Sequence, residues 1–518
     1  MRFKKSWFLF LLFSFPLFDS FHSRHYLRHS IIKHSQIQML LLDPFFMKIP
    51  FFKPKPIILP TNQNDSNNNI NNNIKNNNNS NENKESEKLE KYKEFQMNWY
   101  VIDESKKIRT NQLYQVSIWG KKYVYWKDSN DKYNAIQDAC NHRGAFLSKG
   151  KIIKETNCIQ CPYHGLEFDA NGNLKKIPGQ EIPQAQSFHQ DAFYILEKEG
   201  WLWMNLIPKQ QFTHSKTSEP SEPSEPFEPS EETLLQMLYH EPEAQMQGFS
   251  KIQTNIPSLS VSSQLLSENL LDILHITFVH TFGNKEYPIP LNEPMPYQIR
   301  TFLFNSETDT KSQLNLKSNI QNPTIISKTL NSYPFSLPKT DLTILPPRPH
   351  YGIQYLFKPQ QDSFITNYFG EQNIMIENEF LLPHLTVSRV IFGPYQKTVV
   401  GFSLPLNKTH TRLFVKLYRN YWNAPNKNAN ISFNQKTDTY KSFSPFTWFE
   451  NIIQIICDQM MLYVLLETLE EDRSVVEHLD SMPKGGKYNL KYDKFPSMFR
   501  SMYQKYVLKK NNMTIVDE

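Results

Sequence analysis

The sequence predicts an α+β protein, in which a small all-β domain that presents metal ligands precedes a larger domain of antiparallel sheet and helices. Short aromatic and β-branched segments dominate residues 97–212. Within residues 233–505, a central region of alternating apolar and polar residues indicates strands. Long stretches without Gly or Pro precede and follow this region and indicate helices. At 518 residues, 39% of them hydrophobic, the chain can fill two cores.

The N-terminus has the composition of a targeting leader. Basic residues precede the apolar run Trp7–Phe18, so residues 1–20 are typical of a signal peptide. Residues 21–60 are similar to a transit peptide, because Phe21–Leu42 holds Arg, Lys, His and Ser and no acidic residue. This pair resembles the bipartite leaders of proteins sent to plastids of secondary endosymbiotic origin. We expect a plastid location, with an endomembrane, secreted or membrane-anchored protein as the alternative.

Two low-complexity segments separate the predicted domains. Residues 61–96 are rich in Asn, with a possible short charged helix at Lys84–Phe95, and residues 213–232 repeat Ser-Glu-Pro. A polar tail, residues 506–518, follows the second domain. The net charge of +6 lies in the leader, because residues 1–60 carry nine Lys/Arg and two Asp/Glu, a net of +7 that leaves −1 for the rest. The domains therefore give no sign of a nucleic-acid surface.

The first domain is predicted to consist of short strands joined by polar turns. Asp169–Asn173 is expected to be a hairpin turn, since Asp, Asn and Gly favour tight turns. The expected strands lie at residues 99–102, 113–116, 123–126, 192–195 and 202–204.

Between these strands lie two cysteines and two histidines in matching patterns. Cys140 and His142 form C-x-H, and Cys161 and His164 form C-x2-H. Two thiolates on one iron and two imidazoles on the other are the ligands of a Rieske [2Fe–2S] cluster, a one-electron relay. The alternative is a redox pair or half a zinc site made by Cys158 and Cys161, but zinc leaves the two matched histidines unexplained. Cys158 and Cys457 do not amount to a disulfide framework.

The second domain is predicted to begin with a helix and end with one. Ser267–Phe282 reads as a helix with a Ser cap and Glu268 in its first turn. Residues 300–415 read as many strands, and Trp448–Leu479 as a long helix.

The first of these helices carries the pattern N-x2-D-x2-H-x4-H. Asp272 and His275 are three residues apart and share a helix face, whereas His280 reaches the same metal only if the helix unwinds or ends. Two histidines and a distant carboxylate form the facial triad of non-haem Fe(II) oxygenases, which leaves positions open for O2.

With these motifs, residues 99–506 resemble the Rieske non-haem iron oxygenases. The stretches Cys-Asn-His-Arg-Gly-Ala-Phe-Leu-Ser-Lys-Gly and Cys-Pro-Tyr-His-Gly-Leu-Glu-Phe-Asp carry the resemblance. It implies that His275 and His280 bind a mononuclear iron and that Asp272, with Asn269 beside it, serves catalysis. It also implies that Asp272 bridges to a cluster histidine of the neighbouring subunit in a head-to-tail homotrimer.

The third iron ligand is chosen by its place in the resembling segment. Residues 470–477 are similar to the family's ligand segment, which implies Asp472, with Asp458 as the rival. The long sequence separation between His280 and Asp472 is similar to that in the pheophorbide a oxygenase-like plastid members of the family. Those members often carry a C-terminal membrane anchor. No apolar run follows Asp472, so we expect at most a peripheral membrane contact. Ile452–Leu466 contains Asp458 and is expected to be a core helix rather than a span.

The resemblance implies an oxygenase that uses O2, a [2Fe–2S] cluster and a mononuclear Fe(II). No nucleotide-binding glycine motif is evident, so electrons are expected from a ferredoxin or similar reductase. The substrate is expected to be a hydrophobic small molecule, a chlorophyll derivative or another plastid lipid. The alternatives are a sterol-type desaturase or hydroxylase, and a Rieske electron carrier without catalysis.

Overall fold

The computed structural model describes the domains and not the leader. The described residues are 94–181, 189–210, 230–281, 283–298, 302–305, 341–344, 349–361, 366, 370, 372–423, 445–479 and 490–508. The predicted leader and most of the Asn-rich and Ser-Glu-Pro segments lie outside these residues. Residues 56–518 form one contact unit, so the division into residues 97–212 and 233–505 stays a prediction.

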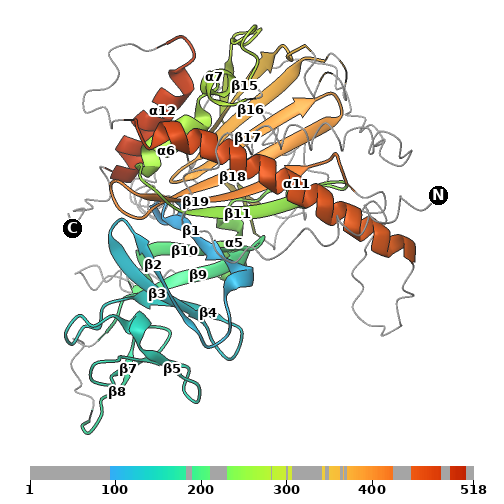
Figure 1. Ribbon diagram of the computed structural model, residues 1–518. Coiled ribbons are helices and arrows are strands. Elements are labelled where there is room, and N and C mark those ends of the chain that lie inside the picture. Colours follow the sequence, from blue (N-terminus) through green and yellow to red (C-terminus); the bar gives the residue numbers. More distant parts are fainter. Residues whose placement is uncertain are drawn as a thin grey trace, which may run out of the picture. The chain divides into compact units, whose positions relative to one another are not determined.

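The first domain is built from two antiparallel sheets (Figure 1). All five predicted strands are present, each longer than predicted by two to five residues, and β4 and the small sheet were not predicted. The six-stranded sheet has the order β1–β10–β9–β4–β3–β2 and consists of β1 (Trp99–Glu104), β2 (Leu113–Ile118), β3 (Lys121–Lys127), β4 (Tyr133–Gln137), β9 (Ala192–Lys198) and β10 (Trp201–Pro208). The four-stranded sheet consists of β5 (Lys151–Ile153), β6 (Cys158–Gln160), β7 (Glu167–Phe168) and β8 (Leu174–Lys176).

The hairpin turn predicted at Asp169–Asn173 is confirmed between β7 and β8. The amide of Asp169 donates to the carbonyl of Asn173 at 3.0 Å. Both the backbone amide and the side-chain amide of Asn173 donate back to the Asp169 carboxylate. An Asp that binds the following amides in this way closes a tight turn.

The second domain is organised on a seven-stranded antiparallel sheet. Its order is β11–β19–β18–β17–β16–β15–β12, and a separate hairpin pairs β13 with β14. The strands are β11 (Ser250–Leu259), β12 (Met295–Gln298), β13 (Phe302–Asn305), β14 (Asp341–Ile344), β15 (His350–Phe357), β16 (Ile374–Leu381), β17 (Leu385–Phe392), β18 (Tyr395–Pro405) and β19 (Thr411–Arg419). The strand-rich middle predicted for residues 300–415 is therefore confirmed where the chain is described.

Helices cover one face of this sheet, where α6 contacts β16, β17 and β18 and α11 contacts β11 (Figure 1). The helices are α5 (Glu231–Met237), α6 (Ser263–Leu271), α7 (His275–Val279), α11 (Pro445–Val476) and α12 (Lys494–Tyr503), with a π-helical end at Gln504–Leu508. Within the described ranges, 3-10 turns lie at Ser105–Lys107, Leu147–Lys149 and Pro242–Ala244.

The predicted helix Ser267–Phe282 is wrong in its start and in its continuity. The hydroxyl of Ser262, not that of Ser267, caps α6 by accepting the amide of Leu265 at 3.3 Å. The helix ends at Asp272, whose backbone is extended and whose Oδ1 accepts the amide of Leu274 at 2.8 Å. This local bond competes with the helical pattern and separates α6 from α7.

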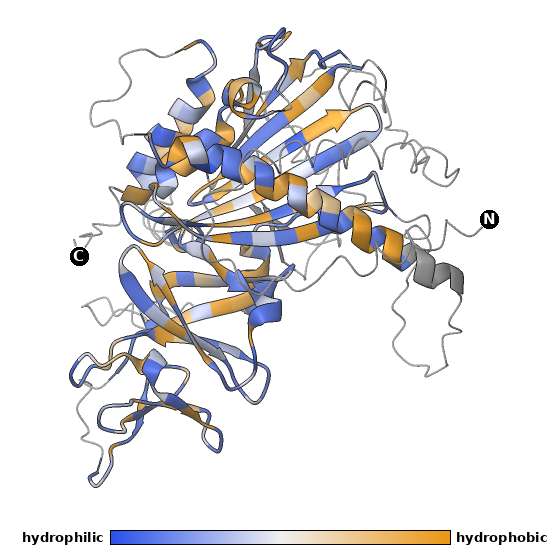
Figure 2. Ribbon diagram, viewed as in Figure 1, coloured by the Kyte–Doolittle hydropathy of each residue, from blue (hydrophilic) through white to orange (hydrophobic). Residues whose placement is uncertain are grey.

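The long helix α11 confirms the prediction for Trp448–Leu479 to within a few residues at each end. Met461, Leu465 and Leu469 are buried against the sheet, whereas Ile455 and Leu466 are exposed. In Figure 2 hydrophobic and hydrophilic residues both occur along the visible side of the helix. Among the described helices, Asn451–Val476 alone is long and apolar enough to cross a membrane, and 28% of its apolar window is buried. The expected core helix is thus only partly buried.

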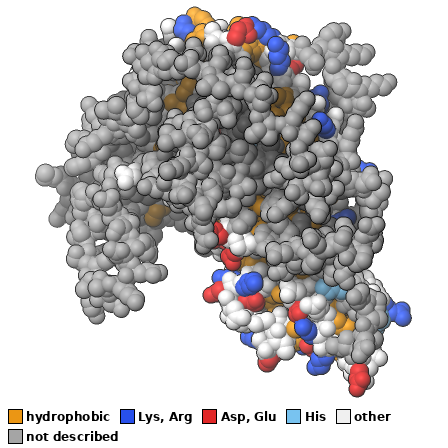
Figure 3. Space-filling model, turned by 180° about the vertical axis from the view of Figure 1, so that it is seen from behind, with side chains coloured by type: hydrophobic (Ala, Val, Ile, Leu, Met, Phe, Trp, Pro, Cys, Tyr) orange, Lys and Arg blue, Asp and Glu red, His pale blue; other side chains and the backbone are white. Residues whose placement is uncertain are grey.

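Buried hydrogen bonds join the six-stranded sheet of the first domain to the second domain. The backbone amide of Val101 on β1 donates to Nε2 of His384 at 3.0 Å, and His384 lies between β16 and β17. The indole of Trp201 donates to Glu241, which also binds Lys416 at 2.8 Å. On the view in Figure 3, the described surface of the first domain mixes acidic and basic side chains.

Candidate metal centres

Two loops with the same hydrogen-bond pattern present the four predicted cluster ligands. In the first loop the amide of Cys140 donates to the carbonyl of Ala145 at 2.9 Å, and the amide of Gly144 donates back to Cys140 at 2.7 Å. In the second loop Cys161 donates to Leu166 at 2.8 Å, and Gly165 donates back to Cys161 at 3.1 Å. Gly144 and Gly165 have φ of +73° and +75°, a conformation that glycine adopts without strain.

The loops bury the cysteines and expose the histidines. Cys140 and Cys161 are 2% and 3% exposed, whereas His142 and His164 are exposed, with ring centroids 4.6 Å apart. Burial, together with the neighbouring Cys161 thiol, raises the pKa of the Cys140 thiol to about 11. At neutral pH the Cys140 thiol therefore ionises only with a cation beside it, and a bound iron would supply that charge.

A buried carboxylate that the sequence analysis did not identify supports the first loop. Asp138 accepts the backbone amide and the hydroxyl of Ser148, both at 2.7 Å, and so closes the loop behind Cys140. Asp138 stands two residues before Cys140 in the sequence, but this spacing does not reveal its supporting role unless the loop geometry is known.

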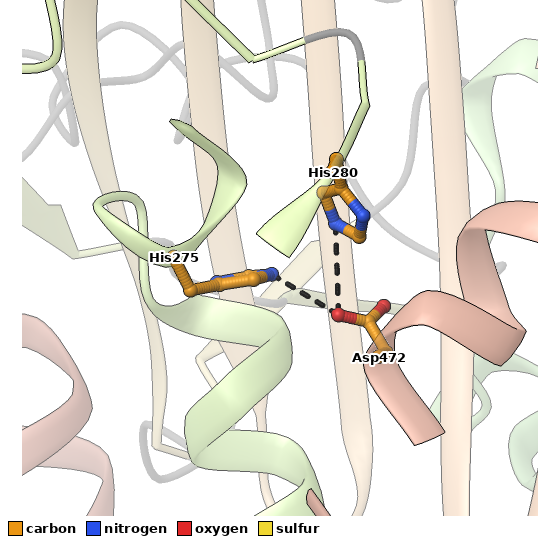
Figure 4. A group of neighbouring side chains, drawn as sticks. All are labelled: His275, His280 and Asp472. Atoms are coloured by element: carbon orange, nitrogen blue, oxygen red, sulfur yellow. Dashed lines mark ion pairs between the residues drawn. The ribbon is translucent and has the colours of Figure 1, made fainter. Parts of the chain in front are cut away.

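The predicted iron ligands His275, His280 and Asp472 lie together (Figure 4). The Nε2 atoms of His275 and His280 lie 3.3 Å and 3.6 Å from Oδ1 of Asp472. His280 and Asp472 are buried, His275 is half-buried, and one potential ligand atom from each side chain lies within 4.8 Å of the others. As expected, His280 follows a helix end, since it terminates α7 with an extended backbone.

The surroundings of the two histidines differ. Burial lowers the pKa of His275, but the Asp472 carboxylate outweighs burial and the net shift is upward. Burial also lowers the pKa of His280, and there it prevails over Asp472 and Glu471, so the net shift is downward. A neutral imidazole is the form that binds a metal, so His280 is held ready for one.

Asn269 and Asp272 lie beside this cluster and contact it through different groups. The side-chain amide of Asn269 donates to Oδ1 of Asp472 at 3.2 Å. The backbone carbonyl of Asp272, rather than its carboxylate, accepts a hydrogen bond from Nδ1 of His275 at 2.8 Å. Asp272 and His275, which were predicted to share a helix face, do not lie on one helix, because α6 ends at Asp272.

The rival ligand Asp458 lies elsewhere on α11. It binds Arg419 at 2.6 Å, and it precedes Asp472 by fourteen positions, which is about 21 Å along the helix. Cys158 and Cys457 are free, buried and outside the candidate ligand sets.

A comparison with family models matches residues 98–188 to the Rieske [2Fe-2S] domain. This segment contains both ligand loops. Among solved structures, dicamba monooxygenase bound to 3,6-dichlorosalicylic acid matches with a TM-score of 0.51 at 14% identity, over 81% of this chain and 99% of that one. The match covers the second domain as well, so the fold of both domains is that of this oxygenase. The chain therefore contains a Rieske [2Fe-2S] domain.

Curated members of the Rieske family match over part of the chain. Chlorophyllide a oxygenase of Chlamydomonas reinhardtii is 28% identical over 37% of this chain and 26% of its own length. The iron-sulfur subunit of the toluene-4-sulfonate monooxygenase system of Comamonas testosteroni is 26% identical over 35% and 45%. The protochlorophyllide-dependent translocon component 52 of Arabidopsis thaliana is 27% identical over 37% and 32%. The matches thus span less than half of each relative.

The cofactors of a Rieske oxygenase, a [2Fe–2S] cluster and a mononuclear iron, fit the residues present in this chain. The paired buried thiols and the exposed imidazoles 4.6 Å apart suit the cluster. Two imidazoles that converge on one carboxylate suit ferrous iron with open positions. The assignment of each ligand residue stays a prediction.

Proposed function

We propose that this protein is an oxygenase that uses O2 and externally supplied electrons to oxidise a hydrophobic substrate. The buried group of His275, His280 and Asp472, downstream of a Rieske domain, carries the proposal. An electron carrier needs no second metal site, so this group argues against the carrier alternative.

Each centre has a role that follows from its surroundings. The exposed His142 and His164 offer a path for electrons to enter and leave the cluster, while Cys140 and Cys161 hold it from the buried side. Ferrous iron bound at the second site would supply the activation of O2. His275, His280 and Asp472 would hold the metal on one side and keep the other open, and Asn269 would orient Asp472.

The substrate class is argued from the relatives. One of them is named for chlorophyllide a and another for protochlorophyllide, and both names place those proteins in the chloroplast. A chlorophyll derivative or another plastid lipid, and a plastid location, are therefore our first choice. The bacterial relative named for toluene-4-sulfonate matches to a similar extent. The alternative stays a sterol-type desaturase or hydroxylase outside the plastid, because the same iron chemistry can remove hydrogens or add a hydroxyl group.

Electrons would come from a ferredoxin or similar reductase, and the active form would be a head-to-tail homotrimer. Phe146 and Tyr163 are exposed on the two ligand loops, and Phe278 is exposed between the two candidate iron histidines. Exposed aromatic residues at the electron-giving and electron-receiving ends suit contact between neighbouring copies. Asp272, half-buried at the end of α6, would then face the cluster of the next subunit.

Anaerobic reconstitution tests the proposed reaction. The protein would be mixed with ferredoxin, its reductase and pheophorbide a, chlorophyllide a or a sterol, and then given labelled O2. Label in the product marks oxygenation, and loss of two hydrogens without label marks desaturation. Reduction and reoxidation of the cluster without any product would support the electron carrier.

A further inference from the structure

Glu471 contacts the candidate iron ligand His280 on the side away from Asp472. Its Oε2 atom lies 3.0 Å from Nδ1 of His280, and its Oε1 atom accepts the backbone amide of Thr281 at 3.3 Å. Both carboxylate oxygens therefore bind the same short segment, one to the ring and one to the backbone that follows it.

This contact sets the proton on the ring. A carboxylate accepts hydrogen bonds and does not donate them, so Nδ1 of His280 carries the hydrogen and Nε2 keeps its lone pair. Nε2 is the atom that lies 3.6 Å from Asp472. The ring of His280 thus lies between two consecutive residues of α11, with Nδ1 toward Glu471 and Nε2 toward the candidate metal centre.

Helix geometry explains how adjacent residues reach opposite edges of one ring. Consecutive side chains on an α-helix point about 100° apart, so Asp472 and Glu471 approach His280 from different directions. His280 needs this support because it follows the last residue of α7 with an extended backbone. Nδ1 of His275, by comparison, binds the neutral backbone carbonyl of Asp272 at 2.8 Å.

We propose that Glu471 is a positioning residue of the metal centre, which holds His280 in its metal-binding tautomer and orientation. A charged partner on the far nitrogen also makes the imidazole a stronger ligand than a carbonyl partner does. The inference rests on the proposed function, because it takes His280 as an iron ligand. Glu471 would touch neither the metal nor the substrate.

Metal affinity tests the inference without turnover. Protein with an assembled cluster and no mononuclear metal would be titrated with Co(II) under anaerobic conditions, in competition with a chromophoric chelator. Partners of this kind typically change affinity by about 10- to 100-fold. We expect Glu471→Gln, which keeps an acceptor but loses the charge, to weaken Co(II) binding by about tenfold, and Glu471→Ala by about a hundredfold.

Glu470→Gln is the matched control, because Glu470 is the preceding residue on α11 and is 63% exposed, 3.8 Å from Arg473. It should bind Co(II) like the wild type, and all variants should keep the visible spectrum of the cluster. Wild-type affinity in both Glu471 variants, or an equal loss in Glu470→Gln, would overturn the inference. Failure of the wild type to bind Co(II), or the same binding in His275→Ala, would instead overturn the proposed metal centre itself.

Discussion

Asn269 donates its side-chain amide to Asp472 at 3.2 Å, across 203 residues of sequence. The last turn of α6 is thereby joined to the end of α11, and the carboxylate is oriented before a metal arrives. A hydrogen bond to a charged group contributes about 1.5–3 kcal/mol.

Asn269→Ala should therefore lower the free energy of unfolding of the metal-free protein by about that amount and weaken Co(II) binding. Gln264→Ala is the control, because it removes an amide–carboxylate bond to Glu268, at 2.9 Å, on the same helix. Denaturant titration and Co(II) titration of both variants check this. Equal Co(II) affinities for the two variants would count against an orienting role for Asn269.

His275→Ala should keep the visible spectrum of the Rieske cluster and abolish turnover. Its ring lies 3.3 Å from Asp472, in the second domain, whereas the cluster ligands lie on loops of the first. Absorption spectra and product mass after reconstitution measure the two effects separately. Retained turnover would remove His275 from the ligand set.

Asp272→Asn should leave both centres intact but slow electron transfer between them. The carboxylate is half-buried, and its Oδ1 accepts the amide of Leu274, a bond that Asn can keep. The charge that would link neighbouring imidazoles is lost. Stopped-flow reoxidation of the reduced cluster with substrate and O2 measures the rate, and an unchanged rate would exclude a bridging role.

Arg389→Met should destabilise the second domain by about 3–5 kcal/mol at pH 7, because it leaves buried carboxylates without their partner. Arg389 binds Glu243 at 2.6 Å and Glu379 at 2.8 Å. Burial alone would raise the pKa of Glu379, but Arg389 reverses this and holds the pKa well below its usual range.

The sign of the pH dependence follows from that depressed pKa. In the wild type the charged form of Glu379 contributes stability above about pH 4, and this contribution is lost as the pH falls. Without Arg389, burial raises the pKa, so protonation relieves the destabilisation. Denaturant unfolding should show the gap between wild type and Arg389→Met shrinking from pH 7 to pH 4. A constant or widening gap would contradict this.

The exposed apolar residues of α11 bear on the predicted peripheral membrane contact. Ile455 and Ile456 are exposed, and their burial in a lipid surface would favour binding. Wild type should co-sediment with galactolipid vesicles, and the double variant Ile455→Ser/Ile456→Ser should not. Wild type that stays in the supernatant would refute the contact.

Local patterns in the sequence predicted the cluster site and the strands around it. Cys140 and His142 are neighbours in sequence, so their spacing alone indicates the chemistry. The start of α6 could not be chosen in this way, because Ser262 and Ser267 are both good caps. The break at Asp272 depends on a side-chain bond to Leu274 that no periodicity shows.

The iron site combines segments far apart in sequence, and only part of it was predictable. The resemblance implied Asp472, and the structure places Asp458 beside Arg419 instead. Glu470, Glu471 and Asp472 are three consecutive acids, and their roles depend on the rotation of α11 against α7. That rotation is set by packing on the sheet, which the sequence alone does not reveal.

The iron content of the purified protein tests the two-centre account most directly. We predict three irons per chain in the wild type, two in the cluster and one mononuclear ferrous ion, and two in His280→Ala with an unchanged cluster spectrum. Two irons per chain in the fully loaded wild type, with no mononuclear ferrous signal, would contradict the account and restore the electron carrier.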